Sequence, residues 1–464
     1  MTDPTLWTAV EQAAAIRERR LGSEELLDLF LDRIDVVDRD VNAVCTLAVD
    51  GARERCRTPD AATVAGEWWG PLHGLPITVK DAIETAGIRS TGGSTELADH
   101  VPTADAPAVA ALKAAGAIVF GKTNLPEWSG DWQSYNEMFG TTNNPWDLTR
   151  TPGGSSGGAA AAVACGMTSF ELGTDIGGSV RVPAAFCGVF GHKPSFGIIP
   201  TYGYLDEPAG GRTQSDVNTF GPIARDAADL DLLLSVLAQP GPDDSAAWRL
   251  ELPDADITSL RGLRVAAWID EPELVGDLAM TAVLHTAVDA MEAAGARVDR
   301  SAKPDVDVTR MWRLGARLIG AAVDVHPEDP SPHPIAHHDW LRLDRERALL
   351  RAAWAQLFER FDVVLCPVML VPAFEHLQEA RWDTRQVSIN GVARPYIELE
   401  SWPAIVGAAY LPSTSTPVGT TPEGLPVGMQ IVAPYLRDRL SIKVAELLAD
   451  TTGRVGRPPI VRSR

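Results

Sequence analysis

The sequence contains few lysines, and it has no surplus of positive charge and no long apolar run. Only six of its 41 basic residues are lysines, and the formal net charge is −21. Such an acidic surface repels phosphate backbones and anionic lipids, so we expect no nucleic-acid partner and no membrane partner. No apolar stretch approaches the roughly 18 residues of a membrane span. The first twenty residues also lack the basic and apolar regions typical of a signal peptide.

Cysteine is also sparse. The five cysteines, at positions 45, 56, 165, 187 and 366, form no CxxC pair and no metal-ligand spacing. An odd, scattered set of this kind favours reduced thiols and therefore a cytoplasmic protein. We predict no metal and no organic cofactor.

The patterns that are present alternate between strands and helices. Residues 5–60 have helical apolar spacing, 74–83 and 117–123 read as strands, and 105–116 as the helix between them. The same alternation returns from residue 262 onward. It predicts an α/β layered fold.

The length of 464 residues allows two or three domains, but no long linker or internal repeat divides the chain. We therefore predict one domain over 1–464. It comprises an N-terminal helical segment at 1–60, a core at 71–200 and a variable insertion or lid at 301–345, which has four prolines within 326–334.

Two motif matches do not fit their expected surroundings. GAIVFGKT (116–123) satisfies the P-loop pattern, yet its middle residues AIVF read as a strand instead of a phosphate-binding loop. GGSSG (153–157) satisfies the nucleophile-elbow pattern GxSxG. That elbow needs an apolar strand immediately before it, whereas the preceding NNPWDLTRTP is polar and contains two prolines. We reject both nucleotide binding and an α/β-hydrolase elbow.

A serine without an obvious histidine base is the better candidate for chemistry. In GTDIGGSVR, two glycines precede Ser179 and allow backbone amides to approach a ligand closely. Lys80 follows the largely apolar PITV, where desolvation would lower the pKa of its amine and suit it as a general base. Simpler alternatives remain open: Ser179 could belong to an ordinary tight turn, and Lys80 could pair with Asp81 or Glu84.

Taken together, four segments resemble the amidase signature family. They are LPITVKD, GKTNLPEW, PGGSSGGAAAAVA and ELGTDIGGSVRVPAAFCGVFGHKPS, and they occur in the family's order. The resemblance extends from about residue 5 to 450 and is strongest over 71–200. It implies a mixed β-sheet core covered by α-helices on both faces.

The resemblance also implies roles for particular residues. Ser179 would be the nucleophile that forms an acyl-enzyme, Ser155 a bridging serine after a cis peptide bond, and Lys80 the neutral base at the end of the relay. The resemblance implies an oxyanion hole formed by the amides of Ile176, Gly177, Gly178 and Ser179. It implies a supporting role for the side chains of Ser156, Asp175 and Arg181.

Substrate class is less constrained. GHKPSFGIIPTYGYLDEP (191–208) is similar to stand-alone amidases, including those that cleave aryl amides and nylon oligomers. We therefore predict a monomer or homodimer that hydrolyses small-molecule amides and accepts esters or carbamates (urethanes). The alternatives are a glutaminase subunit of an amidotransferase complex and a non-catalytic binding protein. We also predict a pocket that accepts aromatic groups, although each aromatic candidate could equally be part of the core. The candidates are Trp128, Trp132, Tyr135, Tyr204, Trp312 and Tyr410.

Overall fold

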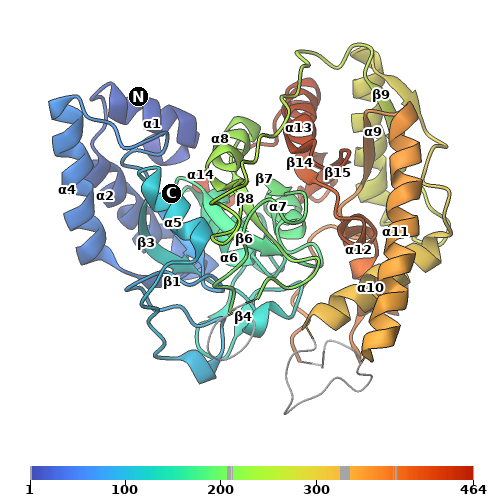
Figure 1. Ribbon diagram of the computed structural model, residues 1–464, viewed down its shortest axis with the longest axis horizontal. Helices are drawn as coiled ribbons and strands as arrows, with labels where there is room; N and C mark the ends of the chain where they lie inside the picture. Colours follow the sequence, from blue (N-terminus) through green and yellow to red (C-terminus); the bar gives the residue numbers. More distant parts are fainter. Residues whose placement is uncertain are drawn as a thin grey trace.

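An eight-stranded mixed sheet forms the centre of the molecule (Figure 1). The computed structural model describes residues 3–205, 211, 213–323, 335–379, 381 and 384–462. The first three strands of the sheet pair in parallel and the others antiparallel. In spatial order the strands are β10 (Arg297–Asp299), β9 (Arg264–Ala267), β11 (Val363–Pro367), β15 (Pro426–Val432), β14 (Ser413–Thr420), β7 (Phe190–Lys193), β8 (Thr219–Ala224) and β6 (Glu171–Asp175).

A three-stranded sheet lies beside the β6 edge. Its order is β1 (Val44–Leu47), β3 (Ile118–Thr123) and β2 (Pro76–Lys80), with β2 parallel to β3. Strand β2 is completely buried and lies next to β6. The carboxyl end of β2 is thereby brought to the edge of the central sheet.

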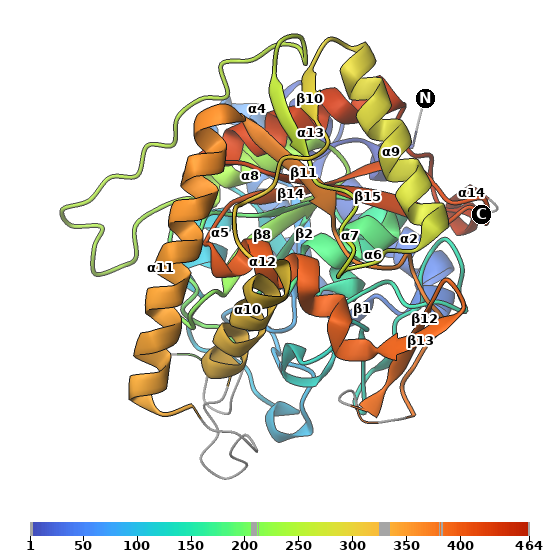
Figure 2. The same cartoon turned by 90° about the vertical axis from the view of Figure 1, so that its right-hand side faces the viewer.

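Helices cover both faces of the central sheet (Figures 1 and 2). One face is covered by α8 (Ala227–Leu237), α9 (Leu278–Ala293) and α13 (Asp438–Thr452). The other face holds α6 (Gly157–Cys165) and α7 (Arg181–Cys187), with α12 (Ser401–Ala408), α10 (Val308–Val323) and α11 (His337–Arg360) beyond them. The remaining α-helices of four or more residues in the described ranges are α1 (Ala9–Arg17), α2 (Ser23–Arg33), α4 (Val49–Ala65), α5 (Pro107–Ala114) and α14 (Pro459–Arg462).

The period-two alternation of the strands produces two apolar cores. In β11, Val363 and Leu365 belong to the core that includes α9 and α13. The intervening Val364 and Cys366 belong to the core built with α10, α11 and α12. Successive strand side chains therefore contribute to opposite layers, as a sheet buried on both faces requires.

The predicted fold class, a mixed sheet with helices on both faces, is confirmed. The segment 5–60 is mostly helical but also contains strand β1, a difference from the expectation. Residues 301–345 contribute α10 and the start of α11, while 324–334 lie outside the described residues. The division into one domain with a variable insertion or lid stays a prediction.

Two small hairpins lie outside the main sheets, formed by β4 (Tyr135–Asn136) with β5 (Gly140–Thr141) and by β12 (Gln386–Ile389) with β13 (Val392–Pro395). None of the helices within the described ranges combines the length and apolar character needed to cross a bilayer.

Candidate active site

Lys80 ends strand β2 and is completely buried. Its Nζ lies 2.7 Å from Ser155 Oγ and 2.7 Å from Thr174 Oγ1. Burial lowers the pKa of Lys80 to about 7, although the charges of Asp175 and Glu171 act in the opposite direction. A large fraction of the amine is therefore neutral near pH 7, as a general base requires.

The acidic neighbours of Lys80 in the sequence have other partners. Asp81 accepts hydrogen bonds from the backbone and side chain of Thr91. Glu84 contacts His100, with 3.2 Å between Glu84 Oε1 and His100 Nε2. Neither of these two carboxylates therefore pairs with Lys80.

Ser155 lies in a loop where the backbone packs very closely. The peptide bond between Gly154 and Ser155 is cis. A Cβ on Gly154 would lie 2.5 Å from the carbonyl oxygen of Asp131, so only glycine fits at this position. Ser156 Oγ lies 3.3 Å from both the amide nitrogen and the carbonyl oxygen of Thr174, which ties the loop to β6.

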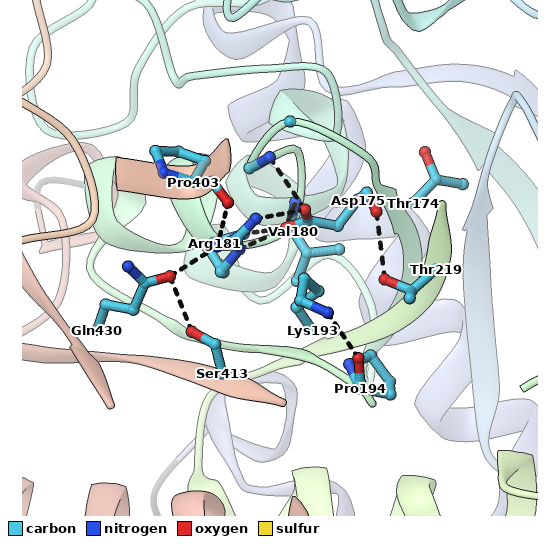
Figure 3. A network of polar contacts seen from close by, with 12 residues as sticks. Thr174, Asp175, Val180, Arg181, Lys193, Pro194, Thr219, Pro403, Ser413 and Gln430 are labelled. Atoms are coloured by element: carbon cyan, nitrogen blue, oxygen red, sulfur yellow. Dashed lines mark hydrogen bonds and ion pairs between the residues drawn. The ribbon is translucent and has the colours of Figure 1, made fainter. Parts of the chain in front are cut away.

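Ser179 lies in the turn between β6 and α7 and is 5% exposed. Asp175 shapes this turn by accepting hydrogen bonds from the amides of Gly178 at 2.9 Å and Val180 at 3.1 Å. Arg181 adds two side-chain hydrogen bonds to the same carboxylate, at 2.8 and 2.9 Å (Figure 3). Burial opposes ionisation of Asp175, but Arg181 outweighs it and lowers the pKa of Asp175 to about 2.

The assignment of the amides of Ile176, Gly177, Gly178 and Ser179 to an oxyanion hole stays a prediction. No hydrogen bond in the described structure uses the amides of Ile176, Gly177 or Ser179. The amide of Gly178 donates to Asp175 in this conformation. Trp132 Nε1 donates to the carbonyl of Gly177 at 2.9 Å and thereby fixes that peptide.

The two serine loops contact each other through their backbones. The amide of Ser156 donates to the carbonyl of Ser179 at 3.2 Å. Within the described residues, no hydrogen bond joins the hydroxyls of Ser155 and Ser179. Catalytic hydrogen bonds are often longer without substrate than in the reacting complex.

Comparison with known proteins shows the family of the chain. The family model described as Amidase matches residues 25–321 and 328–441. The chain belongs to the amidase signature family. The family resemblance inferred from the four motifs is therefore confirmed. Members of this family hydrolyse carbon–nitrogen amide bonds.

The relatives of this amidase-family chain are functionally diverse. It is 32% identical to the glutamyl-tRNA(Gln) amidotransferase A subunit of Moorella thermoacetica, with 96% of each chain covered. The structure of 6-aminohexanoate cyclic dimer hydrolase is 25% identical, with 98% of this chain and 99% of that chain covered and a TM-score of 0.81. A bacterial aryl acylamidase, 24% identical with 99% of both chains covered and a TM-score of 0.83, shares the fold.

A network of buried polar and aromatic side chains reaches the turn that carries Ser179 through Trp132. Asp131 forms an ion pair with Arg385, and both side chains are 5% exposed. Asp131 also accepts hydrogen bonds from the hydroxyls of Tyr135 at 3.1 Å and Tyr396 at 2.8 Å. The Trp132 ring lies 5.4 Å from that of Tyr396. The structure thus brings two predicted pocket residues, Trp132 and Tyr135, into one network near Gly177.

The other four aromatic candidates occupy separate environments. Trp128 packs near Gly92, and its amide donates to the Gly92 carbonyl at 2.8 Å. Tyr204 is buried with its ring 6.2 Å from that of Phe220. Trp312 lies in α10 against the core shared with α11 and α12, and Tyr410 stacks on Phe196 with 4.2 Å between centroids. Their assignment to a substrate pocket stays a prediction.

Several side chains at the site were missed in the sequence reasoning. Thr174 is the second partner of Lys80, and its place directly before Asp175 in a motif strand was an available signal. Glu171, the first residue of β6, is also buried, and burial raises its pKa to about 7. Asp131 lies three residues after the motif GKTNLPEW and was not singled out, and Glu400 lies far from the motifs in sequence. Across the described ranges, no group of three or more His, Cys, Asp or Glu residues is arranged to hold a metal ion.

Proposed function

We propose that the chain hydrolyses the amide bond of a small molecule through an acyl-enzyme on Ser179. The observation that carries this proposal is Lys80, a buried amine with a pKa of about 7 at 2.7 Å from Ser155 Oγ. A lysine that is neutral near pH 7 and bonded to a serine is suited to remove a proton, whereas a surface lysine is not.

In the first step, Ser179 Oγ attacks the carbonyl carbon of the substrate. Ser179 passes its proton to Ser155 Oγ as the proton of Ser155 moves to the lone pair of Lys80 Nζ. Thr174 Oγ1 accepts a hydrogen bond from the same nitrogen and orients that lone pair. The developing oxyanion is stabilised by the unused amides of the turn at Ile176, Gly177 and Ser179.

Collapse of the tetrahedral intermediate breaks the carbon–nitrogen bond. The proton held on Lys80 returns through Ser155 to the leaving nitrogen, which departs as a neutral amine. Water then attacks the Ser179 ester by the same relay and releases the carboxylic acid. Ser156, Asp175 and Arg181 stay outside the proton transfer and hold the two loops in shape.

For the substrate, we propose a small amide, with esters and carbamates as further acceptable groups. The aromatic ring of Trp132, whose indole nitrogen donates to the Gly177 carbonyl, supports a pocket that accepts apolar or aryl parts of a substrate. Structural likeness to 6-aminohexanoate cyclic dimer hydrolase is consistent with a synthetic amide.

A second candidate is a glutaminase subunit that works within an amidotransferase complex. It is favoured by full-length relatives such as the 32% identical A subunit from Moorella thermoacetica. Both functions use the same relay. They differ in whether the single chain is active without partner subunits, and in which amide it hydrolyses.

The test measures the purified single chain on three substrates: a 4-nitroanilide amide, the matching carbamate-type 4-nitroanilide, and glutamine. Release of 4-nitroaniline that is lost in Ser179→Ala supports an independent amidase. Release of ammonia from glutamine, without cleavage of either nitroanilide, supports the amidotransferase function. Equal activity of Ser179→Ala and the wild type would exclude the Ser179 mechanism.

A further inference from the structure

Asn218 is a buried carboxamide whose hydrogen-bonding atoms have no partner among the described residues. It directly precedes strand β8 and is 2% exposed, yet neither Oδ1 nor Nδ2 forms a hydrogen bond within the described chain. A buried amide in this state is unfavourable, because its donors and its acceptor have lost their contacts with water. Asn144, another buried asparagine, donates to two backbone carbonyls and accepts from a backbone amide. Asn218 therefore has a hydrogen-bonding capacity that the described part of the chain does not use.

Asn218 lies close to the turn that carries Ser179. In the ladder between β8 and β6, Thr219 is opposite Asp175, and the Thr219 hydroxyl donates to the Asp175 carbonyl at 3.2 Å (Figure 3). That carbonyl belongs to the peptide group whose nitrogen is the amide of Ile176, one of the predicted oxyanion donors. Since Asn218 is the residue before Thr219, its backbone lies roughly 5 to 10 Å from that of Ile176. Asn218 is thus near the place where the scissile carbonyl must bind if Ile176 donates to its oxygen.

The residue before Asn218 has an unusual backbone conformation. Val217 is buried with a φ of 56°, in the left-handed region that β-branched residues rarely adopt. Its amide donates to Asp216 Oδ1 at 2.9 Å, and Asp216 is itself held by Arg347 at 2.6 Å and by the Tyr410 hydroxyl at 2.5 Å. Strained conformations persist where the surrounding structure fixes them, and they are concentrated at functional sites. These contacts fix the backbone that carries Asn218, although its side chain has no partner of its own in the described chain.

The chemistry of a carboxamide indicates which ligand group it binds best. Its oxygen accepts an N–H and its nitrogen donates to a carbonyl, so an amide on a ligand can form both hydrogen bonds at once. An ammonium would use only the oxygen, and a carboxylate would use only the nitrogen. The side chain of Asn218 is also uncharged and therefore gives an ionic ligand no additional attraction. A neutral amide group is the ligand chemistry that uses all of the free capacity of Asn218.

We propose that Asn218 is a specificity-determining residue that binds a second amide group of the substrate, a few atoms from the scissile carbonyl. The preferred substrates are then small diamides, in which one amide is cleaved while the other is held, over monoamides of the same size. This inference rests on the proposed amide hydrolysis, because it needs the scissile carbonyl at the turn that carries Ser179.

The test uses three ligands of matched length and branching: glutaramic acid 4-nitroanilide, 5-oxohexanoic acid 4-nitroanilide and 5-methylhexanoic acid 4-nitroanilide. The first ends in a carboxamide, the second has a methyl group in place of the NH2, and the third also has a methyl group in place of the carbonyl oxygen. All three are neutral, so the negative charge of the chain does not favour one over another. Binding is measured by titration calorimetry at pH 8 in the Ser179→Ala background, so that no turnover is needed.

We expect the carboxamide ligand to bind about fivefold or more tightly than the ketone, and the ketone more tightly than the alkyl compound. The reason is that each replacement removes one buried hydrogen bond to Asn218. Asn218→Leu keeps the branching at Cγ but removes both polar atoms, so the preference for the carboxamide should disappear. Asn218→Ala should have the same effect on the preference without adding bulk. Gln214→Leu is the matched control, because the exposed Gln214 already accepts from the Thr201 amide at 3.2 Å; it should leave the preference unchanged.

The urea midpoint of unfolding separates a binding role of Asn218 from a structural one. Replacing a fully bonded asparagine, as in Asn144→Leu, should lower the midpoint clearly, whereas Asn218→Leu should lower it less or not at all. The inference is overturned if the carboxamide and the ketone bind equally with Asn218 present, or if the carboxamide ligand fails to bind. It is also overturned if both Asn218 variants keep the preference, or if Asn218→Leu lowers the midpoint as much as Asn144→Leu. Failure of the amidase proposal is seen separately, as absence of 4-nitroaniline release by the wild type from all three compounds.

Discussion

Two regions meet at the site, and they are built differently. The floor, defined as residues 71–200, brings backbone segments so close that a Cβ on Gly154 or Gly158 would lie 2.5 Å from a neighbouring main-chain atom. The wall, defined as α10, α11 and residues 384–411, contributes large side chains such as Trp402 and Tyr396, which are completely buried. The structure of the floor thus depends on small residues that allow close backbone contacts. The structure of the wall depends on the packing of large side chains.

This difference indicates that the floor and the wall have different roles. The proposed relay needs three functional groups, from the end of strand β2 and from two loops, at hydrogen-bond distance, and small shifts there would break it. The wall has no member of the proposed relay, and many of its large side chains belong to the core built with α10, α11 and α12. Substitutions in the floor should therefore affect the chemical step, while those in the wall should affect stability and substrate preference.

The largest expected effect is on the relay itself. Ser179→Ala and Lys80→Ala should each lower kcat by about a thousandfold or more, because removing one member of a proton relay disables the whole unit. Initial rates of 4-nitroaniline release measure this. Lys303→Ala, which removes a half-exposed lysine paired with Glu271, is the control and should retain activity. Comparable losses in the control would mean that the assay reports on folding.

Next is the brace that joins floor and wall. Arg181 and Asp175 are both completely buried, so Arg181→Met leaves an uncompensated carboxylate. We expect the free energy of unfolding to fall by about 3 to 5 kcal/mol, together with loss of activity as the oxyanion turn loses its shape. Urea denaturation followed by fluorescence measures the first effect. An Arg181→Met variant with unchanged stability would contradict the role of this ion pair.

The floor can also be probed through pH. Since Lys80 must be neutral to accept a proton and burial lowers its pKa to about 7, kcat/KM should rise as pH increases through 7 and then level off. The charge of Glu171 raises the pKa of Lys80, so Glu171→Gln should move this rise to lower pH by about half a unit. Glu84→Gln, whose carboxyl contacts His100, should leave the profile in place. A shift to higher pH in Glu171→Gln would contradict the electrostatic account.

The same contrast explains how much the sequence could reveal. The floor was predictable because its constraints are local: GGSSGG and GTDIGGS are dense in glycine, and Lys80 is a rare lysine after an apolar strand. Even so, the contact between Lys80 and Ser155 came from family resemblance, and the use of the Gly178 amide by Asp175 was not foreseen.

The wall was harder to predict because its contacts join distant parts of the chain. The ion pair between Asp131 and Arg385 connects positions 254 residues apart, and neither residue lies in a recognisable motif. Glu400 follows an unremarkable YIEL segment, and only the tertiary packing of α12 on the turn shows that its carboxyl lies beside Gly177. Aromatic residues alone did not distinguish pocket from core.

The smallest expected effect comes from Tyr410, at the outer side of the wall. Its hydroxyl donates to Asp216 at 2.5 Å, and Arg347 lies 4.5 Å above its ring while also pairing with Asp216. Tyr410→Phe removes one hydrogen bond and keeps the ring contacts, so the free energy of unfolding should fall by about 1 kcal/mol. Because Tyr410 has no contact with the relay, the pH profile of kcat/KM should stay unchanged in the same variant. If Tyr410→Phe instead moved the rise near pH 7, wall and floor would be electrostatically coupled, and the separation of chemistry from substrate preference would fail at this residue.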